Sequence, residues 1–218
     1  MAREKRFFDC EVRMAGDGDQ PIIEGYAAVF DWSPLMWGWF REKPMPGAFV
    51  NSIGRDDVRG LKNHDPNFVL GRNRAGTLKL AEDSRGLHFE LTPPAKQQWV
   101  RDLADSMERG DISGGSFQFD AVNVRWSSHK SDEGHEEERR ELLEVRLYDI
   151  SVVTFPFYPQ ADTHVRSVAE FEQSLKSADL AVNDEVMQRM RQRLGSGAGA
   201  GDDARARSSK ARERLLRF

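Results

Sequence analysis

One serine and its neighbours form the stretch of this sequence most open to a chemical interpretation. Ser116 follows two glycines in DISGGSFQFD, and the Phe-Gln-Phe alternation after it indicates a strand. A serine hydroxyl is a poor nucleophile until a base takes its proton, and histidine is the usual base because its pKa lies near 6.5. Gly-Gly-Ser alone is a weak pattern that more often marks an ordinary strand start. A nucleophilic role therefore depends on a base and an acid elsewhere in the chain.

Five histidines are candidates for the base. His64 follows the predicted short strand Val58–Asn63, and the ends of strands in a rigid scaffold are where catalytic side chains tend to lie. His88 lies inside a strand pattern with no acidic partner, and His164 follows the last predicted strand. The last two, His129 and His135, lie in a charged segment with no predicted scaffold to fix their position. His64 is the leading candidate by position, and the alternatives stay open.

The candidate for the acid is Asp149, which interrupts the apolar run Leu147–Val153. A carboxylate in apolar surroundings is costly unless another group pairs with it, and a histidine would be a suitable partner. The period of two also places Leu147, Asp149 and Ser151 on one face of a strand. An Asp149 that simply faces outward on a polar side is therefore an equally good interpretation.

A metal site is a weak alternative. The charged segment Ser127–Arg140 contains five residues of metal-binding type: His129, Asp132, Glu133, His135 and Glu136. Their spacing matches no ligand motif of a helix or a turn. The sequence also has no Walker-type or dinucleotide-binding loop. We therefore expect neither a metal nor a cofactor.

Length and composition limit the class of protein. The 218 residues, 39% apolar and 31% charged, suit one domain with an appendage or two small domains. The net charge of −4 gives no general attraction to nucleic acid, and the single Cys10 excludes an internal disulfide. The amino terminus does not resemble a secretory signal, and no apolar stretch approaches the roughly 20 residues that span a bilayer. We expect a soluble protein without a membrane partner, made in a reducing cytoplasm.

The elements that must position these residues are mostly strands. A short helix is expected after Pro46, and a longer one after Pro93-Pro94 that ends at Gly110. Asp31–Pro46 is expected to be irregular and Ser127–Arg140 to be a loop. Besides the strand that follows Ser116, the alternation of apolar residues predicts these strands: Phe8–Met14, Ile22–Phe30, Val58–Asn63, Thr77–Ala81, Leu87–Leu91, Leu142–Leu147 and Ile150–Phe155. The pattern predicts a mainly β (α+β) fold, a closed antiparallel β-barrel of about seven strands with peripheral helices.

The composition changes after the last strand. We predict a barrel domain over residues 1–165, a helical extension over 166–194, and a flexible linker with a basic tail over 195–218. The tail Asp202–Phe218 has six basic and three acidic residues, a net charge of +3. Such a tail could bind nucleic acid weakly or an acidic protein surface, but a solvated, disordered end is the favoured interpretation.

Six segments in a fixed order resemble a known family, the prohead (capsid maturation) proteases of tailed bacteriophages. Each segment alone is weak, and the ordered set is specific. The segments run from Gly25 to Ala161: GYAAVF, PGAF, NHD followed by LG, GL-F, ISGGSFQF and LYDISVVTFPFYPQA. The family is similar in fold and mechanism to the herpesvirus assembly proteases, so the resemblance implies a herpesvirus-protease-like barrel and a serine endopeptidase.

The resemblance also implies roles for three residues. The family's N-H-D histidine falls on His64, its S-x-x-S-F-x-F nucleophile on Ser116, and its acidic third member on Asp149. Aspartate replaces the commoner glutamate here, and the shorter side chain must come about one methylene closer. The herpesvirus relatives use a second histidine instead, which keeps His164 as a rival for the third place. By analogy with the relatives, the segment after Asp149 is the candidate for the backbone amides that stabilise the oxyanion.

Two functions follow as hypotheses. The resemblance implies a protease packaged inside the immature phage capsid in the host cytoplasm. Its substrates would be the scaffolding segment of the major capsid protein, or a separate scaffold, and the protease itself. The alternative is a non-catalytic internal scaffold or binding module that uses the basic tail; self-association is open in both cases. The presence of all three residues, His64, Ser116 and Asp149, favours the protease, because a module without chemistry has no need of them.

Overall fold

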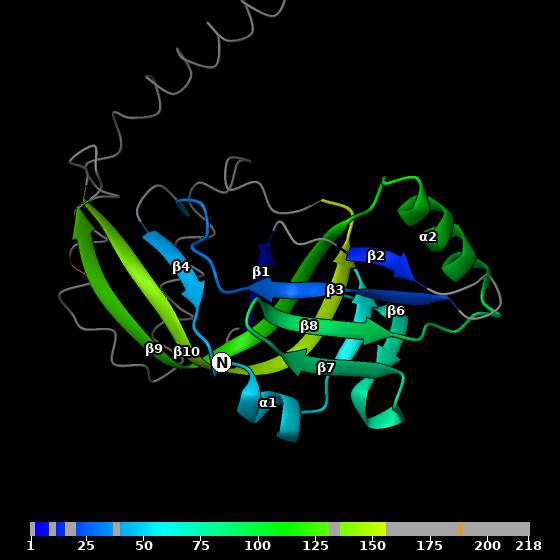
Figure 1. The fold of residues 1–218 in the computed structure, drawn as a ribbon, viewed down its shortest axis with the longest axis horizontal. Helices are drawn as coiled ribbons and strands as arrows, with labels where there is room; N and C mark the ends of the chain where they lie inside the picture. Colours follow the sequence, from blue (N-terminus) through cyan, green and yellow to red (C-terminus); the bar gives the residue numbers. More distant parts are fainter. Residues whose placement is uncertain are drawn as a thin grey trace, which may run out of the picture. The chain divides into compact units, whose positions relative to one another are not determined.

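A computed structural model describes residues 3–8, 12–15, 21–36, 40–130, 136–155 and 188 (Figure 1). The chain divides into two compact units, Met1–Leu180 and Ala181–Phe218, and every described residue except Gln188 belongs to the first. Almost all of the expected helical extension and the whole linker and tail lie outside the described residues. The division predicted at residues 165 and 194 therefore stays a prediction.

The described strands form two sheets. The larger sheet has six strands, and two long ones form its centre. In sheet order its strands are β1 (Glu4–Phe8), β9 (Gly114–Lys130), β10 (Glu136–Val153), β5 (Arg59–Lys62) and β6 (Asp65–Arg72), and β4 (Phe40–Pro44) also pairs with β10. The smaller sheet has the order β2 (Val12–Ala15), β3 (Ile22–Val29), β8 (Gly86–Leu91) and β7 (Leu78–Glu82). The helices are α1 (Val50–Arg55), α2 (Gln98–Glu108) and the short 3-10 helix η1 (Asn73–Ala75).

The mainly β class is confirmed, but the closed antiparallel barrel of about seven strands is wrong for the described part of the chain. There the larger sheet is curled and open, like half a barrel, and the second sheet is antiparallel (Figure 1). β4 and β5 both run parallel to β10 and share one of its edges, at Glu138–Leu142 and at Asp149–Val152. The short strands β4 and β5 thus pair with successive parts of the same edge of β10. The outer strands of the sheet are β1 and β6, which do not pair with each other, so the sheet is not closed.

The segment Ser127–Arg140, expected to be a loop, instead extends the central hairpin. Its described residues continue β9 and β10, which remain paired out to Lys130 and Glu136. Residues 131–135 lie outside the described part. Polar and charged pairs link these strands: Ser128 donates to Glu138 at 2.9 Å, and Arg125 forms an ion pair with Glu141. Cross-strand polar pairs of this kind stabilise a sheet even where apolar residues do not alternate. The search for alternating apolar residues therefore did not predict this part of the strands.

Two other expectations near the amino terminus need correction. The single strand expected over Phe8–Met14 is replaced by β1 and β2, which belong to different sheets. The irregular segment Asp31–Pro46 contains β4, in which the charged Glu42 is fully buried. The alternation of apolar residues did not predict β4, because one of its buried positions is a carboxylate that is paired with cations.

The strands expected over Ile22–Phe30, Thr77–Ala81 and Leu87–Leu91 are present, and so is the longer helix. β2 pairs with β3 and β7 with β8, both antiparallel. The longer helix, α2, begins at Gln98 rather than directly at Pro93-Pro94, and its buried face contains Val100, Leu103 and Met107. Gly110 follows its end in a left-handed conformation with φ of 80°, which suits glycine.

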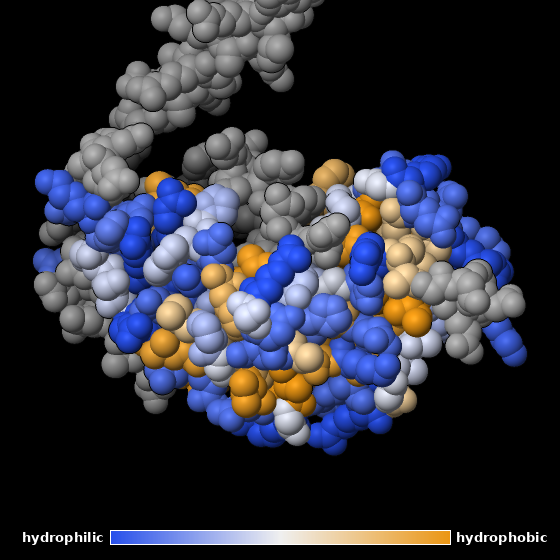
Figure 2. Space-filling view, viewed as in Figure 1, coloured by the Kyte–Doolittle hydropathy of each residue, from blue (hydrophilic) through white to orange (hydrophobic). Residues whose placement is uncertain are grey.

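The apolar core includes side chains from both sheets. Phe117 and Phe119 of β9 and Phe89 of β8 are fully buried in it, and Phe49 meets Phe117 edge to face at 5.6 Å. The surface in Figure 2 is largely hydrophilic, with an apolar patch where Figure 1 shows α1. Among the described residues, no helix has the length and apolar character to cross a membrane. The core holds β9 firmly on one face, so the other face can carry a precisely placed side chain.

Candidate active site

The pairing of β9 with β10 brings Ser116 to one face of the larger sheet. Directly opposed residues of antiparallel strands point to the same face. Ser116 is opposite Ser151, and Gln118 is opposite Asp149. The intervening Phe117 is fully buried on the core side. Polar side chains of the two central strands therefore meet on the face away from the core.

An irregularity at Tyr148 places Asp149 on that face. The register shifts between Leu147, which is opposite Phe119, and Asp149, so Tyr148 is an extra residue in β10. Without this bulge, Asp149 would share the core face with the buried Leu147, as the simple period of two suggests. The interpretation that placed Leu147 and Asp149 together on an outward polar face is therefore wrong.

The bulged Tyr148 is itself held in place. Its hydroxyl donates to Asp120 Oδ2 at 2.6 Å, and the guanidinium of Arg3 lies 4.0 Å from the centre of its ring. Burial raises the pKa of Tyr148, and the hydrogen bond to Asp120 raises it further. The tyrosine thus stays a neutral donor that fixes the bulge.

His64 reaches the same face through a tight turn between β5 and β6. Asn63 and His64 both have positive φ, at 53° and 56°. Such a conformation is uncommon outside glycine, although Asn and His are among the residues that adopt it most readily. The Asn63 side chain binds both the hydroxyl and the backbone N–H of Thr154, at 3.1 and 2.9 Å. The two bonds hold the strained turn beside the end of β10.

The three predicted site residues form one line of polar contacts. His64 Nδ1 lies 2.5 Å from Asp149 Oδ1, and His64 Nε2 lies 2.6 Å from Ser116 Oγ. The short side chain of Asp149 reaches the imidazole directly. The structure thus brings together His64, Ser116 and Asp149, which come from a turn and two different strands.

Ser151 also belongs to this site, and sequence reasoning missed it. Its hydroxyl lies 2.9 Å from Asp149 Oδ1 and 3.2 Å from His64 Nδ1, and its oxygen accepts from the backbone N–H of His64 at 3.1 Å. The available signal was the Asp-Ile-Ser spacing, because residues two apart in a strand share a face. Ser151 thereby links the imidazole, the carboxylate and the backbone of the turn.

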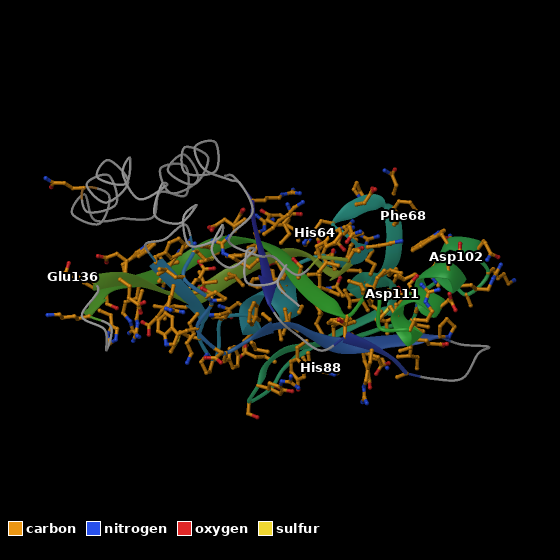
Figure 3. The ribbon with its side chains drawn as sticks, turned by 90° about the horizontal axis from the view of Figure 1, so that it is seen from above. His64, Phe68, His88, Asp102, Asp111 and Glu136 are labelled. Carbon is orange, nitrogen blue, oxygen red and sulfur yellow. The ribbon has the colours of Figure 1, made fainter. Side chains whose placement is uncertain are left out.

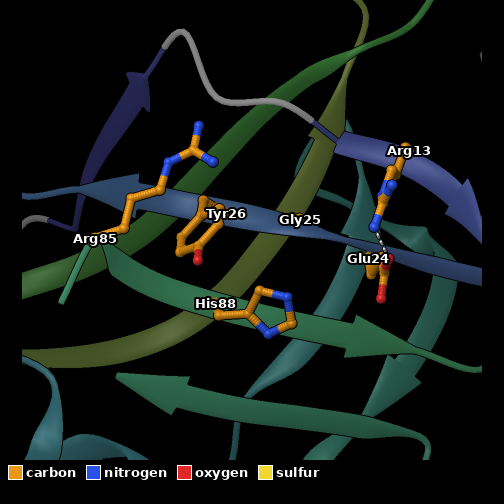
Figure 4. A pocket seen from close by; sticks show the side chains of 6 residues that line it. All are labelled: Arg13, Glu24, Gly25, Tyr26, Arg85 and His88. Atoms are coloured by element: carbon orange, nitrogen blue, oxygen red, sulfur yellow. Dashed lines mark hydrogen bonds and ion pairs between the residues drawn. The ribbon is translucent and has the colours of Figure 1, made fainter. Parts of the chain in front are cut away.

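The other histidines lie elsewhere. His88 is on β8, and Figure 3 shows it on the opposite side of the ribbon from His64. It lines a surface pocket of the smaller sheet with Arg13, Glu24, Gly25, Tyr26 and Arg85 (Figure 4). None of the three predicted site residues lines this pocket, so its position gives no support to a catalytic His88.

His129 and the metal alternative also lie apart from the line of contacts. His129 is opposite Glu137 near the far end of the hairpin, the end that Glu136 marks in Figure 3. His135 and His164 lie outside the described residues, as do Asp132 and Glu133 of the suggested metal set. Within the described ranges, no three His, Cys, Asp or Glu residues are grouped so that they could hold a metal.

Serine hydrolases have a hydroxyl, an imidazole and a carboxylate that contact one another in this order in space. The model of the Caudovirus prohead serine protease family matches residues 8–176, so this chain belongs to that family. It is 28% identical over 186 residues to the prohead protease of Enterobacteria phage HK97, an alignment that covers 83% of this chain and 75% of that protein. No solved structure matches the chain. The resemblance read from the sequence is confirmed, and with it the class of serine protease.

Proposed function

We propose that this protease cleaves the scaffolding segment of its phage's major capsid protein, or a separate scaffold, and also its own chain. It would do so inside the immature capsid during assembly in the host cell. Membership of the prohead protease family supports a role in capsid maturation. The chemical part of the proposal rests on two contacts. Ser116 Oγ lies 2.6 Å from His64 Nε2, and His64 Nδ1 lies 2.5 Å from Asp149 Oδ1.

The proposed reaction is an acyl transfer in two steps. Ser116 Oγ attacks the carbonyl carbon of the scissile bond while His64 Nε2 takes the hydroxyl proton. His64 then gives that proton to the leaving amine, and water releases the acyl group by the same path. Asp149 keeps the Nδ1 proton of His64 facing away from Ser116 and stabilises the imidazolium when it forms.

Co-expression with the cognate capsid protein tests the proposal. We expect the wild-type chain to shorten the capsid precursor and Ser116→Ala to leave it intact, because the variant has no nucleophile. Loss of one hydroxyl leaves little cavity, so the melting temperature should change little. His88→Ala is the matched control and should cleave as the wild type does.

Two results would contradict the proposal in different ways. Cleavage by Ser116→Ala at the wild-type rate would mean that another group is the nucleophile. A wild-type chain that binds the precursor without shortening it would favour the alternative, a non-catalytic internal scaffold or binding module.

A further inference from the structure

The proposed nucleophile is shielded. Ser116 has no exposed surface, and the side chains of His64 and Asp149 are 3% and 5% exposed. An attack on a peptide carbonyl requires its carbon to come within about 3–3.5 Å of the serine oxygen. A polypeptide cannot reach Ser116 in this arrangement unless some part of the chain moves away.

The segment seated against Ser116 is the amino-terminal strand β1. It pairs antiparallel with β9 over five residues, and Phe7 lies opposite Ser116. The hydroxyl of Ser116 donates to the backbone carbonyl of Arg6 at 2.8 Å. A peptide carbonyl of the protein itself therefore contacts the proposed nucleophile.

This carbonyl is also a competing acceptor for the proton on which the proposed reaction depends. A serine hydroxyl has a single proton. Two acceptors lie within its reach, the Arg6 carbonyl at 2.8 Å and His64 Nε2 at 2.6 Å, so the carbonyl competes with the base for that proton. The seated β1 thus covers Ser116 and places a second acceptor beside its hydroxyl.

Removal of β1 would leave a surface suited to a polypeptide. β1 is the end strand of the larger sheet, and on that side β9 has no other partner among the described strands. A bare strand edge exposes backbone N–H and C=O groups that an extended peptide can pair with. We propose that β1 is an internal competitor of the polypeptide substrate for the edge of β9 at Ser116, and that cleavage requires β1 to leave. The inference rests on the proposed role of Ser116 as nucleophile.

Charged side chains anchor β1 in the seated position. Arg6 Nε lies 2.5 Å from Glu42 of β4, and Glu4 accepts from Arg140 of β10 at 2.7 and 2.9 Å. Arg140 also donates to Glu42 at 2.7 Å. These four residues, the β1 ion cluster, are almost fully buried. A five-residue strand at the end of a sheet is a segment that can open without global unfolding, so this anchor sets how often it leaves.

A cross-strand disulfide tests whether β1 must leave. Lys5 and Gln118 are directly opposed in the β1–β9 register. Opposed residues of antiparallel strands have Cα atoms about 4.5–5.5 Å apart, a separation that a disulfide can span. The variant combines Lys5→Cys and Gln118→Cys with Cys10→Ser, which removes the native thiol. The readout is the rate at which a fluorophosphonate labels Ser116, with fluoride as the leaving group, followed by mass spectrometry.

We expect oxidation of this variant to slow labelling by roughly tenfold or more, and reduction to restore it. The matched control places the same type of disulfide between β2 and β3, with Arg13→Cys and Glu24→Cys in the Cys10→Ser background. Arg13 and Glu24 are also directly opposed. Oxidation of the control should leave the labelling rate unchanged. Equal rates for the oxidised and reduced forms of the β1–β9 variant would overturn the inference.

A second variant makes the opposite change to the disulfide, because it weakens the anchor of β1. Arg6→Ala removes one side chain of the β1 ion cluster while Arg140 stays beside Glu42. We expect a severalfold faster labelling of Ser116 than in the wild type, and faster hydrogen exchange in β1. A folded Arg6→Ala protein that labels no faster contradicts the inference alone. A Ser116 that stays unlabelled in every form contradicts the proposed function as well, so the two failures can be told apart.

Discussion

At the scale of single residues, the site depends on hydrogen bonds that orient His64. Asp149 and Ser151 approach the Nδ1 side of the ring, and Ser116 approaches the Nε2 side. A carboxylate at Nδ1 selects the tautomer whose Nε2 can accept a proton. The rival third member, His164, lies outside the described residues.

The choice between these two third members can be made by substitution. We expect Asp149→Asn to lower kcat by roughly 10²–10⁴-fold, because an amide can leave the imidazole in the wrong tautomer. His164→Ala should retain activity. Cleavage of the capsid precursor, or of a peptide from its processed site, measures both. An active Asp149→Asn together with an inactive His164→Ala would assign the third place to His164.

We expect Ser151 to act as a positioning residue, so its loss should be milder than that of Asp149. We expect Ser151→Ala to lower kcat by roughly tenfold with little change in KM, since the hydroxyl would act through His64 and Asp149, which it contacts. Ser106 is the matched control, a half-buried serine of α2 whose hydroxyl donates to a carbonyl of the same helix. Ser106→Ala should keep both constants. A rise in KM at constant kcat would instead place Ser151 in substrate binding.

At the scale of elements, the larger sheet is tied together by buried charges as well as by apolar contacts. The β1 ion cluster connects β1, β4 and β10, with Arg140 and Glu42 fully buried. Breaking such a pair leaves an uncompensated buried charge, which is strongly destabilising. These strands therefore depend on one another, and on the charge state of the carboxylates.

The pKa of Glu4 makes this dependence measurable. Burial alone would raise the pKa of this carboxyl, but the charges of Arg140 and Arg6 outweigh burial and lower it to about 2, from 4.5. A folded-state pKa below the unfolded value stabilises the protein above the unfolded pKa, and the stabilisation is lost as pH falls through 4.5 toward 2. Glu4→Gln removes this titration.

Urea unfolding at about pH 6 and about pH 3 checks the effect. We expect the wild type to lose on the order of 2 kcal/mol more unfolding free energy between these conditions than Glu4→Gln does. The same loss in both proteins would mean that Glu4 is not held in its charged form by the arginines.

At the scale of the whole molecule, the segments outside the described residues carry a prediction made from sequence alone. Gly195–Gly201 consists of small residues, and small, polar exposed segments near a terminus are the preferred sites of proteolysis. Because the segment belongs to the protease's own chain, its effective concentration near the active site can be millimolar. We expect the protein to cut itself between Leu194 and Ala204 and to release the basic tail.

Intact-mass analysis over time measures this processing. The wild type should lose roughly its last 15 to 25 residues, whereas Ser116→Ala should keep them. If an active wild type remains full length, the segment is only a tether. If both proteins are trimmed alike, a protease of the host is responsible.

The sequence by itself determined the secondary-structure elements that depend only on residues close together in the chain. The alternation after Ser116 predicted a strand, the alternations over Ile22–Phe30 and Leu87–Leu91 predicted two strands of the smaller sheet, and Pro93-Pro94 with Gly110 predicted the helix α2. The residues alone named Ser116, His64 and Asp149 as candidates and left rival histidines open; the resemblance to the family then singled out these three. Their ordered motifs were enough to identify the family.

Only the tertiary structure decided which distant segments pair. The bulge at Tyr148 that turns Asp149 to the site is defined by its partner strand β9. The burial of Glu42 and Arg140 depends on charges that are 98 residues apart in the chain. The seating of β1 against Ser116 joins residues 110 apart. Pairings over such separations leave no local period in the sequence, since their energy comes from contacts that exist only after the sheets have formed.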